Sequence, residues 1–213
     1  MILTFIRHGK TRANEERRYL GKTDEPLSEK GIRDLLSYKE QGIYPKIDAL
    51  FVSPMKRCLQ TAEILYPQLP AQIIPEWEEI DFGRFEYKNY EMLKNDAAYQ
   101  AWIDSNGTLP FPEGESREAF LIRCEKGFRR MCERLYLPRQ DALTGPQAKE
   151  RAAGLIVHGG TIMALLSLYG GKEYFAYQVR PGDGYQCRMC VLKSEGQMEK
   201  VSLKEIQALQ EDG

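Results

Sequence analysis

Phe5-Ile6-Arg7-His8-Gly9-Lys10-Thr11 is the stretch that decides the fold, and Leu155-Ile156-Val157-His158-Gly159-Gly160-Thr161 repeats its pattern far along the chain. In both copies apolar residues lead to a histidine, a glycine and a threonine, as expected where a buried strand ends in a loop. Ligands of α/β proteins bind beyond the carboxyl ends of parallel strands, so two such strands side by side would bring both histidines to one site. A single histidine is more often a hydrogen-bonded residue near the core. These are the only two histidines of the chain, and their shared pattern favours a site.

The remaining apolar runs predict a three-layer α/β/α fold with a mostly parallel central sheet. Strands are expected at 2–6, 49–52, 71–74 and 155–157, and a hairpin of 185–193 and 200–203 adds an antiparallel edge. Helices are expected at 29–41, 55–65, 116–137 and 161–168, the first of them after the N-cap residue Ser28. Segment 85–116 is rich in aromatic residues and turn formers, and it is either an inserted helical cap over the site or an insertion that only packs. We therefore predict a single domain over residues 1–213.

The composition is that of an ordinary globular protein. Hydrophobic residues make up 42% of the 213, charged residues 29%, and the net charge of −1 gives no reason to expect nucleic acid or a membrane as partner. Residues 1–57 carry twelve Lys or Arg against eight Asp or Glu, which suits an anionic ligand. No signal peptide precedes Met1, no apolar run approaches the ~20 residues of a membrane span, and the five cysteines are odd in number, so we expect a reduced, cytoplasmic protein. Cys187 and Cys190 have the spacing of a metal-binding pair but lack a second pair for zinc, and we expect them to be structural.

Two further segments carry residues suited to phosphate chemistry. Arg57 lies in the first turn of the helix after the second predicted strand, where an arginine is usually a solvated surface residue unless it shares the sheet edge with His8. The run 76–81 interleaves four carboxylates with aromatic and aliphatic residues. A carboxyl group in such an apolar setting has a raised pKa, as a general acid needs. Arginine guanidiniums, helix amino ends and the amide of Asn14 can hold a phosphate, which a neutral imidazole can attack.

Arg7-His8-Gly9, followed by Thr11 and Asn14, resembles the signature of the histidine phosphatase superfamily, whose members include cofactor-dependent phosphoglycerate mutases. Further motifs follow in the family's order: Ser53-Pro54 with Arg57, Gln60-Thr61-Ala62, Glu79-Ile80-Asp81-Phe82-Gly83, Pro112-Glu113-Gly114-Glu115-Ser116 and Val157-His158-Gly159. The resemblance implies that His8 is the nucleophile, Glu79 the proton donor and His158 a further catalytic residue. It also implies a phosphate pocket made of Arg7, Asn14, Arg57, His158 and Gly159, with no metal and no organic cofactor. Activity should then fall as His8 becomes protonated, from a reference pKa of about 6.5.

Within the superfamily the chain looks most like the alpha-ribazole phosphatases, which act late in cobalamin nucleotide-loop assembly. The likeness rests on the segment 69–76 before the acidic run, on Trp102 in the cap and on the short chain. Where the family usually has Trp-Glu-Gly after the acid, this chain has Phe85-Glu86-Tyr87. The segment 85–116 carries six acids against two bases, which favours a flat, uncharged leaving group over a phosphoglycerate.

The function we expect is therefore hydrolysis of a small-molecule phosphomonoester through a phosphohistidine, with alpha-ribazole 5'-phosphate as the substrate. A broad-specificity phosphatase of sugar phosphates or other metabolites is the alternative. A cofactor-dependent phosphoglycerate mutase and a non-catalytic phosphate-binding module are weaker alternatives, and a homodimer is left open.

Overall fold

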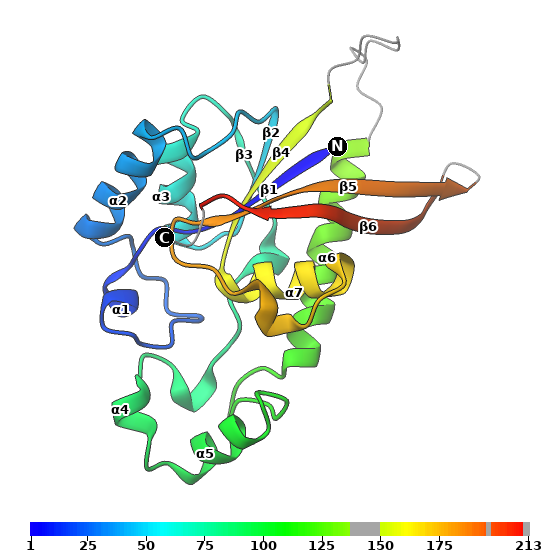
Figure 1. Cartoon of the computed structure of the whole chain (residues 1–213). Helices are drawn as coiled ribbons and strands as arrows, with labels where there is room; N and C mark the ends of the chain where they lie inside the picture. The colour runs from blue at the N-terminus through cyan, green and yellow to red at the C-terminus, as the bar shows by residue number, and fades with distance from the viewer. Residues whose placement is uncertain (137–149, 195–196, 211–213) are drawn as a thin grey trace.

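The computed structural model describes residues 1–136, 150–194 and 197–210, and its centre is a sheet of six strands (Figure 1). The strands are β1 (Ile2–Arg7), β2 (Ala49–Val52), β3 (Ala71–Ile73), β4 (Ala152–Val157), β5 (Gly184–Ser194) and β6 (Gln197–Ala208). Their order across the sheet is β3-β2-β4-β1-β5-β6, in which the first four are parallel and β5 and β6 form the antiparallel edge. The predicted fold class is confirmed, although β4 and β6 are longer than their apolar runs indicated.

β1 and β4 are neighbours in the sheet, as the repeated histidine pattern predicts. They pair in parallel with Arg7 opposite Val157, so His8 and His158 follow the two strands at the same edge. Both strands are almost completely buried, since helices cover the two faces of the sheet. Strands buried on both faces have near-continuous apolar sequences, which explains why these two were recognisable.

Helices on both faces of the sheet complete the three layers. α2 (Glu29–Glu40) and α3 (Lys56–Leu65) lie on one face, and α6 (Arg117–Tyr136) and α7 (Gly159–Gly170) lie on the other (Figure 1). Successive side chains of β1 point to opposite faces, so Phe5 joins the buried cluster that holds Phe128 of α6, whereas Ile6 joins the one that holds Leu35 of α2. Ser28 caps α2 as predicted, with its hydroxyl accepting a hydrogen bond from the Gly31 N–H.

The segment 85–116 forms a helical insertion between β3 and α6. It contains α4 (Tyr90–Leu93) and α5 (Ala97–Asp104), and the 3₁₀ helices η1 (Pro75–Trp77) and η2 (Gly83–Phe85) lead into it. Its aromatic residues extend the large buried cluster that also holds Phe128: Trp102 stacks on Tyr99 with 6.1 Å between ring centroids, and Phe85 is fully buried beside both. Figure 1 shows α4 and α5 well away from the sheet, on the side where α1 (Arg12–Glu15) also lies.

The helices and strands that the structure describes leave some of the sequence predictions untested. The connection at 138–154 lies mostly outside the described residues, and the single domain over 1–213 stays a prediction. All five cysteines are free thiols. Within the described ranges, no helix is long and apolar enough to cross a bilayer.

Candidate active site

His8 directly follows β1 and is almost fully buried, with 3% of its surface exposed. Its backbone N–H donates to the Val157 carbonyl of β4 at 3.0 Å, which ties the residue to the neighbouring strand. The ring Nδ1 lies 2.7 Å from the Gly9 carbonyl oxygen. Because a carbonyl oxygen can only accept, Nδ1 carries a proton and donates it, and in the neutral ring Nε2 keeps its lone pair. The hydrogen bond therefore selects the tautomer that a nucleophile needs.

The environment of His8 keeps its ring neutral. Its pKa is lowered well below 6.5, first because burial disfavours the imidazolium and then because Arg57 and Arg7 are close. The hydrogen bond to Gly9 acts in the opposite direction without offsetting these effects. The fall in activity on protonation of His8 is therefore expected below the reference pKa of about 6.5, and it stays a prediction.

His158 is the N-cap residue of α7 and is fully buried. Its ring centroid lies 5.2 Å from that of His8, with 66° between the ring planes. Its Nε2 is 2.8 Å from Ser53 Oγ. Its pKa is lowered well below 6.5 by burial and then by Arg57 and His8. The prediction that the two strands bring both histidines together is confirmed.

Two arginines accompany the histidines, of which Arg57 is fully buried and Arg7 is partly buried. Arg57, in the first turn of α3, is 0% exposed and so is not the solvated residue that is usual at such a position. Its two terminal nitrogens donate to the carbonyl oxygens of Thr23 and Gly21, both at 2.9 Å. Arg7 Nη1 donates to the Val179 carbonyl oxygen at 2.7 Å. The Nε groups of both arginines are buried and have no partner in the described part of the chain, an arrangement that an anion would relieve.

Glu79 is a buried carboxyl group with 8% of its surface exposed. Its Oε1 accepts from the Ile80 N–H at 2.9 Å, and its Oε2 accepts from the Gly160 N–H in the first turn of α7 at 3.3 Å. Burial has the largest effect on its pKa and raises it, in spite of these hydrogen bonds and of the charges on Arg57 and Arg7. A Cβ at Gly160 would lie 2.3 Å from Oε1, so any larger residue at this position in α7 would displace the Glu79 carboxyl group from its present place.

The other three carboxyl groups of the acidic run have different environments. Glu76 forms an ion pair with an arginine of α6, and Glu78 is exposed. Asp81 pairs with Lys22 at 2.7 Å. Partial burial would raise the pKa of Asp81, but hydrogen bonds from Lys22 and from a backbone N–H lower it overall. Glu79 is the member of the run whose burial raises its pKa, and it therefore fits the role of a general acid.

Asn14 is held at the start of α1 by reciprocal capping. Its side-chain oxygen accepts from the Thr11 N–H at 3.2 Å, and the Thr11 hydroxyl accepts from the Asn14 N–H at 3.3 Å. The amide nitrogen of Asn14 is left as the group that could donate to a phosphate. Asn14 lines a shallow depression with Lys10 and Arg17 instead of the main cavity. Its role, like that of Gly159, stays a prediction.

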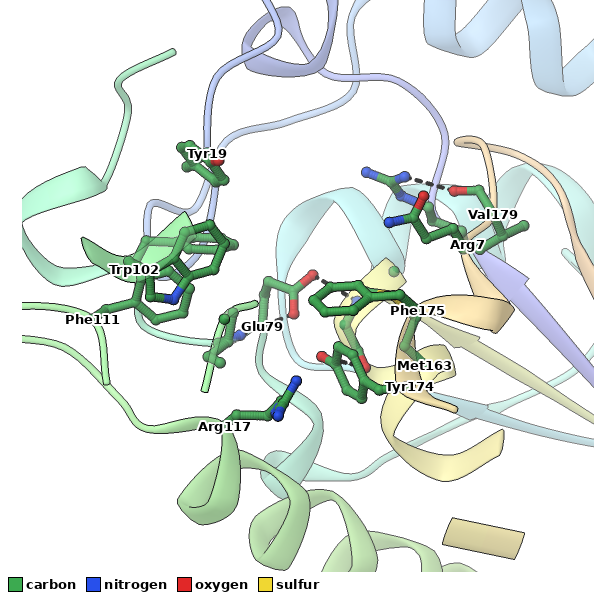
Figure 2. A pocket seen from close by; sticks show the side chains of 16 residues that line it. Arg7, Tyr19, Glu79, Trp102, Phe111, Arg117, Met163, Tyr174, Phe175 and Val179 are labelled. Carbon is green, nitrogen blue, oxygen red and sulfur yellow. Dashed lines mark hydrogen bonds between the residues drawn. The ribbon is translucent and has the colours of Figure 1, made fainter. Parts of the chain in front are cut away.

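A cavity of about 300 Å³ opens at this edge of the sheet (Figure 2). Arg7, Glu79 and Gly159 line it, whereas His8, Arg57 and His158 are buried and are not lining residues. We define the basic end of the site as Arg7, His8, Arg57, His158 and Gly159. Figure 2 shows a group of aromatic side chains on the far side of Glu79 from Arg7, and we define the aromatic end as Tyr19, Phe82, Trp102, Phe111 and Arg117.

A comparison with protein families can now be set beside this geometry. The model of the histidine phosphatase superfamily (branch 1) matches residues 3–206. The chain belongs to the histidine phosphatase superfamily. The match extends from β1 into β6, so it includes both histidine motifs and the cap.

Relatives of this member of the superfamily carry both phosphatase and mutase names. The adenosylcobalamin/alpha-ribazole phosphatase of Escherichia coli (strain K12) is 34% identical over 138 residues, which cover 62% of this chain and 68% of the relative. A protein of Enterobacter sp. (strain 638) with the name phosphoglycerate mutase GpmB is 31% identical over 177 residues, covering 80% of this chain and 75% of the relative. The crystal structure of the alpha-ribazole phosphatase from Shigella flexneri has the same fold, with a TM-score of 0.72 at 24% identity over 96% of this chain and 95% of that one.

The acidic composition of the cap does not extend into the cavity. The six acids of segment 85–116 are Glu86, Glu91, Asp96, Asp104, Glu113 and Glu115, and none of them is among the described residues that line the cavity. The charged cap-side residue that does line it is Arg117, the residue after this segment. The acidic composition of the cap therefore does not count against a phosphoglycerate, because none of these six side chains lines the cavity.

At Phe85-Glu86-Tyr87 the cap places a tyrosine in a backbone conformation that favours glycine. Tyr87 has a φ of 60°, in the left-handed region that favours glycine. The resemblance implies that glycine is the usual residue of the superfamily at this position. Its hydroxyl donates to the Glu25 carboxylate at 2.8 Å, a contact that glycine could not make. Glu86 accepts hydrogen bonds from two backbone N–H groups of the loop whose carbonyls hold Arg57. The cap is thus connected to the basic end through this loop.

Sequence reasoning missed the cavity residues that come from outside the cap. Tyr19 lies in the loop after α1, and Tyr174 and Phe175 belong to η3 (Tyr174–Tyr177), after α7. These segments are short and show no periodicity. Clustered aromatic residues next to predicted loops were the one available signal, and it does not distinguish a cavity wall from ordinary packing.

Proposed function

We propose that this member of the superfamily hydrolyses phosphomonoesters through a covalent phosphohistidine on His8. The observation that carries the proposal is a pair of opposite pKa shifts at one sheet edge, lowered for His8 and raised for Glu79. A neutral imidazole and a carboxyl group with a raised pKa, both near the start of α7, are suited to nucleophilic attack with proton donation. A module that only bound phosphate would need neither group, and this favours an enzyme.

In the first step, His8 Nε2 attacks phosphorus, and the bond between phosphorus and the ester oxygen breaks. Glu79 gives its proton to that oxygen, so the alcohol leaves as a neutral molecule and Glu79 becomes a carboxylate. The guanidiniums of Arg7 and Arg57, together with His158 and the amino end of α7, are the groups suited to hold the other phosphate oxygens.

In the second step, water cleaves the phosphohistidine. The Glu79 carboxylate takes a proton from the water while the water oxygen attacks phosphorus and the bond from phosphorus to Nε2 breaks. Inorganic phosphate leaves, His8 recovers its lone pair, and Glu79 is again a carboxylic acid.

The proposed substrate is alpha-ribazole 5'-phosphate. Support comes from the relatives named as alpha-ribazole phosphatases and from the aromatic end of the site, where Tyr19, Trp102 and Phe111 could contact a flat ring. A broad-specificity phosphatase of sugar phosphates or other metabolites is the alternative. Such an enzyme would use the same two steps with less dependence on the aromatic end.

A phosphoglycerate mutase is the second candidate, favoured by the GpmB name among the relatives and by the cation Arg117 at the aromatic end. A mutase would pass the phosphoryl group from His8 to another oxygen of the substrate instead of to water. The two functions therefore differ in whether inorganic phosphate is released.

The test is a comparison of kcat/KM for alpha-ribazole 5'-phosphate, 3-phosphoglycerate, sugar phosphates and nucleotides, with inorganic phosphate measured in each case. We expect alpha-ribazole 5'-phosphate to exceed the others by about 10-fold or more. Similar values across the panel would favour the broad phosphatase. Isomerisation of 3-phosphoglycerate without phosphate release would favour the mutase, and no turnover would leave a binding module. A cytoplasmic location and a homodimer remain predictions.

A further inference from the structure

Arg117 is a cavity-lining guanidinium with unused hydrogen-bond donors. Its Cζ lies 5.6 Å from the ring centroid of Tyr174, and its Nη1 is a long 3.4 Å from the Asn106 carbonyl oxygen. It forms no ion pair with any residue that the structure describes. Arg123, further along the same helix, shows the contrast: it binds both carboxylate oxygens of Glu115 and three backbone carbonyls.

The position of Arg117 in its helix is electrostatically unfavourable. It is the first residue of α6, where the partial positive charge of the helix amino end disfavours a cation. No carboxylate of the described chain compensates by pairing with it. A guanidinium at this position, partly exposed and lining a cavity, is available to bind an anionic ligand.

A second unused donor lies in the same wall. The indole Nε1–H of Trp102 is buried and has no hydrogen-bond partner among the described residues, although the ring stacks on Tyr99 and packs against Phe111 at 5.0 Å. A buried polar group without a partner is costly unless a ligand supplies an acceptor. The aromatic end therefore combines flat apolar surfaces with two donors in need of acceptors.

The arrangement places both donors on the leaving-group side of the reaction. Figure 2 shows Arg7 on one side of Glu79 and Trp102 on the other, with Arg117 reaching from the start of α6 toward Glu79 and Tyr174. A phosphate held by Arg7 directs its ester oxygen toward Glu79. The group attached to that oxygen then extends toward Trp102 and Arg117.

We infer that Arg117, with Trp102 beside it, selects phosphomonoesters whose leaving group is planar and carries a hydrogen-bond acceptor on its edge, most strongly a carboxylate. The inference rests on the proposed function and adds a specificity residue that lies outside the predicted cap. A charge-assisted hydrogen bond from a guanidinium is stronger than one between neutral groups, so a carboxylate is preferred over a ring nitrogen or an amide oxygen.

The test uses 3- and 4-substituted phenyl phosphates with carboxy, carbamoyl or isopropyl groups, which are similar in size. Wild-type enzyme should favour carboxy over isopropyl substrates, and Arg117→Gln should reduce this kcat/KM ratio about 10- to 100-fold, mainly through KM. The kcat/KM ratio of carbamoyl over isopropyl substrates should fall about 2- to 10-fold in the same variant. Comparing ratios between enzymes removes the electronic difference between the leaving groups. Thermal unfolding of the variant should be unchanged or shifted upward, since a cation leaves the helix amino end.

Arg84→Gln is the matched control, because Arg84 is a cap-side arginine that pairs with Asp96 and does not line the cavity. Arg117→Lys should keep part of the preference for carboxylate. Equal substrate ratios in wild type and Arg117→Gln, or the same fall in Arg84→Gln, would overturn the inference.

Failure of the proposed function is detected separately. Calorimetry on the inactive His8→Ala background measures binding of the same phenyl phosphates, with and without Arg117→Gln. Binding preference without turnover by wild type would contradict the phosphatase and keep Arg117 as a recognition residue. Turnover without any preference would contradict the inference alone.

Discussion

The basic end of the site is mostly buried and is held largely by backbone groups, with only Arg7 partly exposed, whereas side chains from segments far apart in the sequence form the aromatic end. His8, Arg7 and Arg57 each form hydrogen bonds with backbone carbonyl oxygens, at distances between 2.7 and 2.9 Å. Trp102 and Arg117 are held differently: the indole N–H of Trp102 has no partner in the described chain, and the Arg117 guanidinium is a long 3.4 Å from the Asn106 carbonyl oxygen. Backbone hydrogen bonds therefore fix the basic end before a ligand arrives, although its two Nε groups still have no acceptor, whereas the aromatic end is not fixed in this way.

This difference suggests how chemistry and selectivity are divided. Backbone hydrogen bonds position the basic end independently of most side-chain substitutions, so the phosphoryl-transfer groups keep their geometry while the aromatic end can vary. Changes at the basic end should therefore affect kcat for every substrate. Changes at the aromatic end should affect KM for particular substrates.

Replacing His8 gives the largest expected effect. His8→Ala should lower kcat by about 10⁴-fold or more for all substrates and abolish acid-labile phosphate in denatured, quenched enzyme, because the attacking nitrogen is gone. His158→Ala is the comparison, since it removes the other histidine but leaves the nucleophile and should still trap phosphate. Trapped phosphate in His8→Ala but not in His158→Ala would show that His158, and not His8, is the nucleophile.

Glu79→Gln should lower kcat by about 10²- to 10⁴-fold for alkyl phosphates and much less for 4-nitrophenyl phosphate, whose leaving group needs no proton. The exposed neighbour Glu78 offers a matched control, Glu78→Gln, which should leave both rates unchanged. A fall that is equal for the two kinds of substrate would show that Glu79 supports the structure and does not donate the proton.

The same variant tests the pH dependence. His8 is active when neutral, so its lowered pKa keeps kcat/KM high well below pH 6.5. Glu79 is active when protonated, so activity falls as the pH rises through its raised pKa. In Glu79→Gln the fall on the alkaline side should disappear while the acidic side is retained; an unchanged alkaline limb would argue that another group is titrating.

At the aromatic end, Trp102→Ala should raise KM about 10-fold for substrates with an aromatic leaving group and leave it unchanged for small alkyl phosphates. Tyr90→Ala is the control, because Tyr90 also contacts Tyr99, at 6.4 Å between ring centroids, but does not line the cavity. Equal effects of the two variants would indicate a loosened cap core instead of a lost substrate contact.

The smallest effect is expected at Ser53, whose hydroxyl lies 2.8 Å from His158 Nε2. Ser53→Ala should lower kcat about 2- to 5-fold for all substrates, because it frees the ring of His158 without removing it. Since the chain has two histidines, nitrogen NMR can follow the tautomer of each, and only that of His158 should change. A change confined to KM for aromatic substrates would contradict the division between the two ends.

The sequence was sufficient for the basic end because its residues follow elements with a strong pattern. His8 and His158 directly follow the apolar strands β1 and β4. Arg57 lies in the first turn of the amphipathic helix α3, which follows the apolar strand β2. It was insufficient for Tyr19, Tyr174 and Phe175, which lie in a loop and a short 3₁₀ helix where local pattern carries no information about the direction of a side chain.

By itself, then, the sequence determined the sheet, the pairing of the two histidine motifs and the superfamily, because strand periodicity and motif spacing are local properties. Only the tertiary structure decided which of four neighbouring carboxyl groups is buried, that the acids of the cap do not line the cavity, and that Arg117 does. Burial and side-chain direction depend on packing between distant segments, and so do the pKa shifts of His8 and Glu79 that the proposed reaction uses.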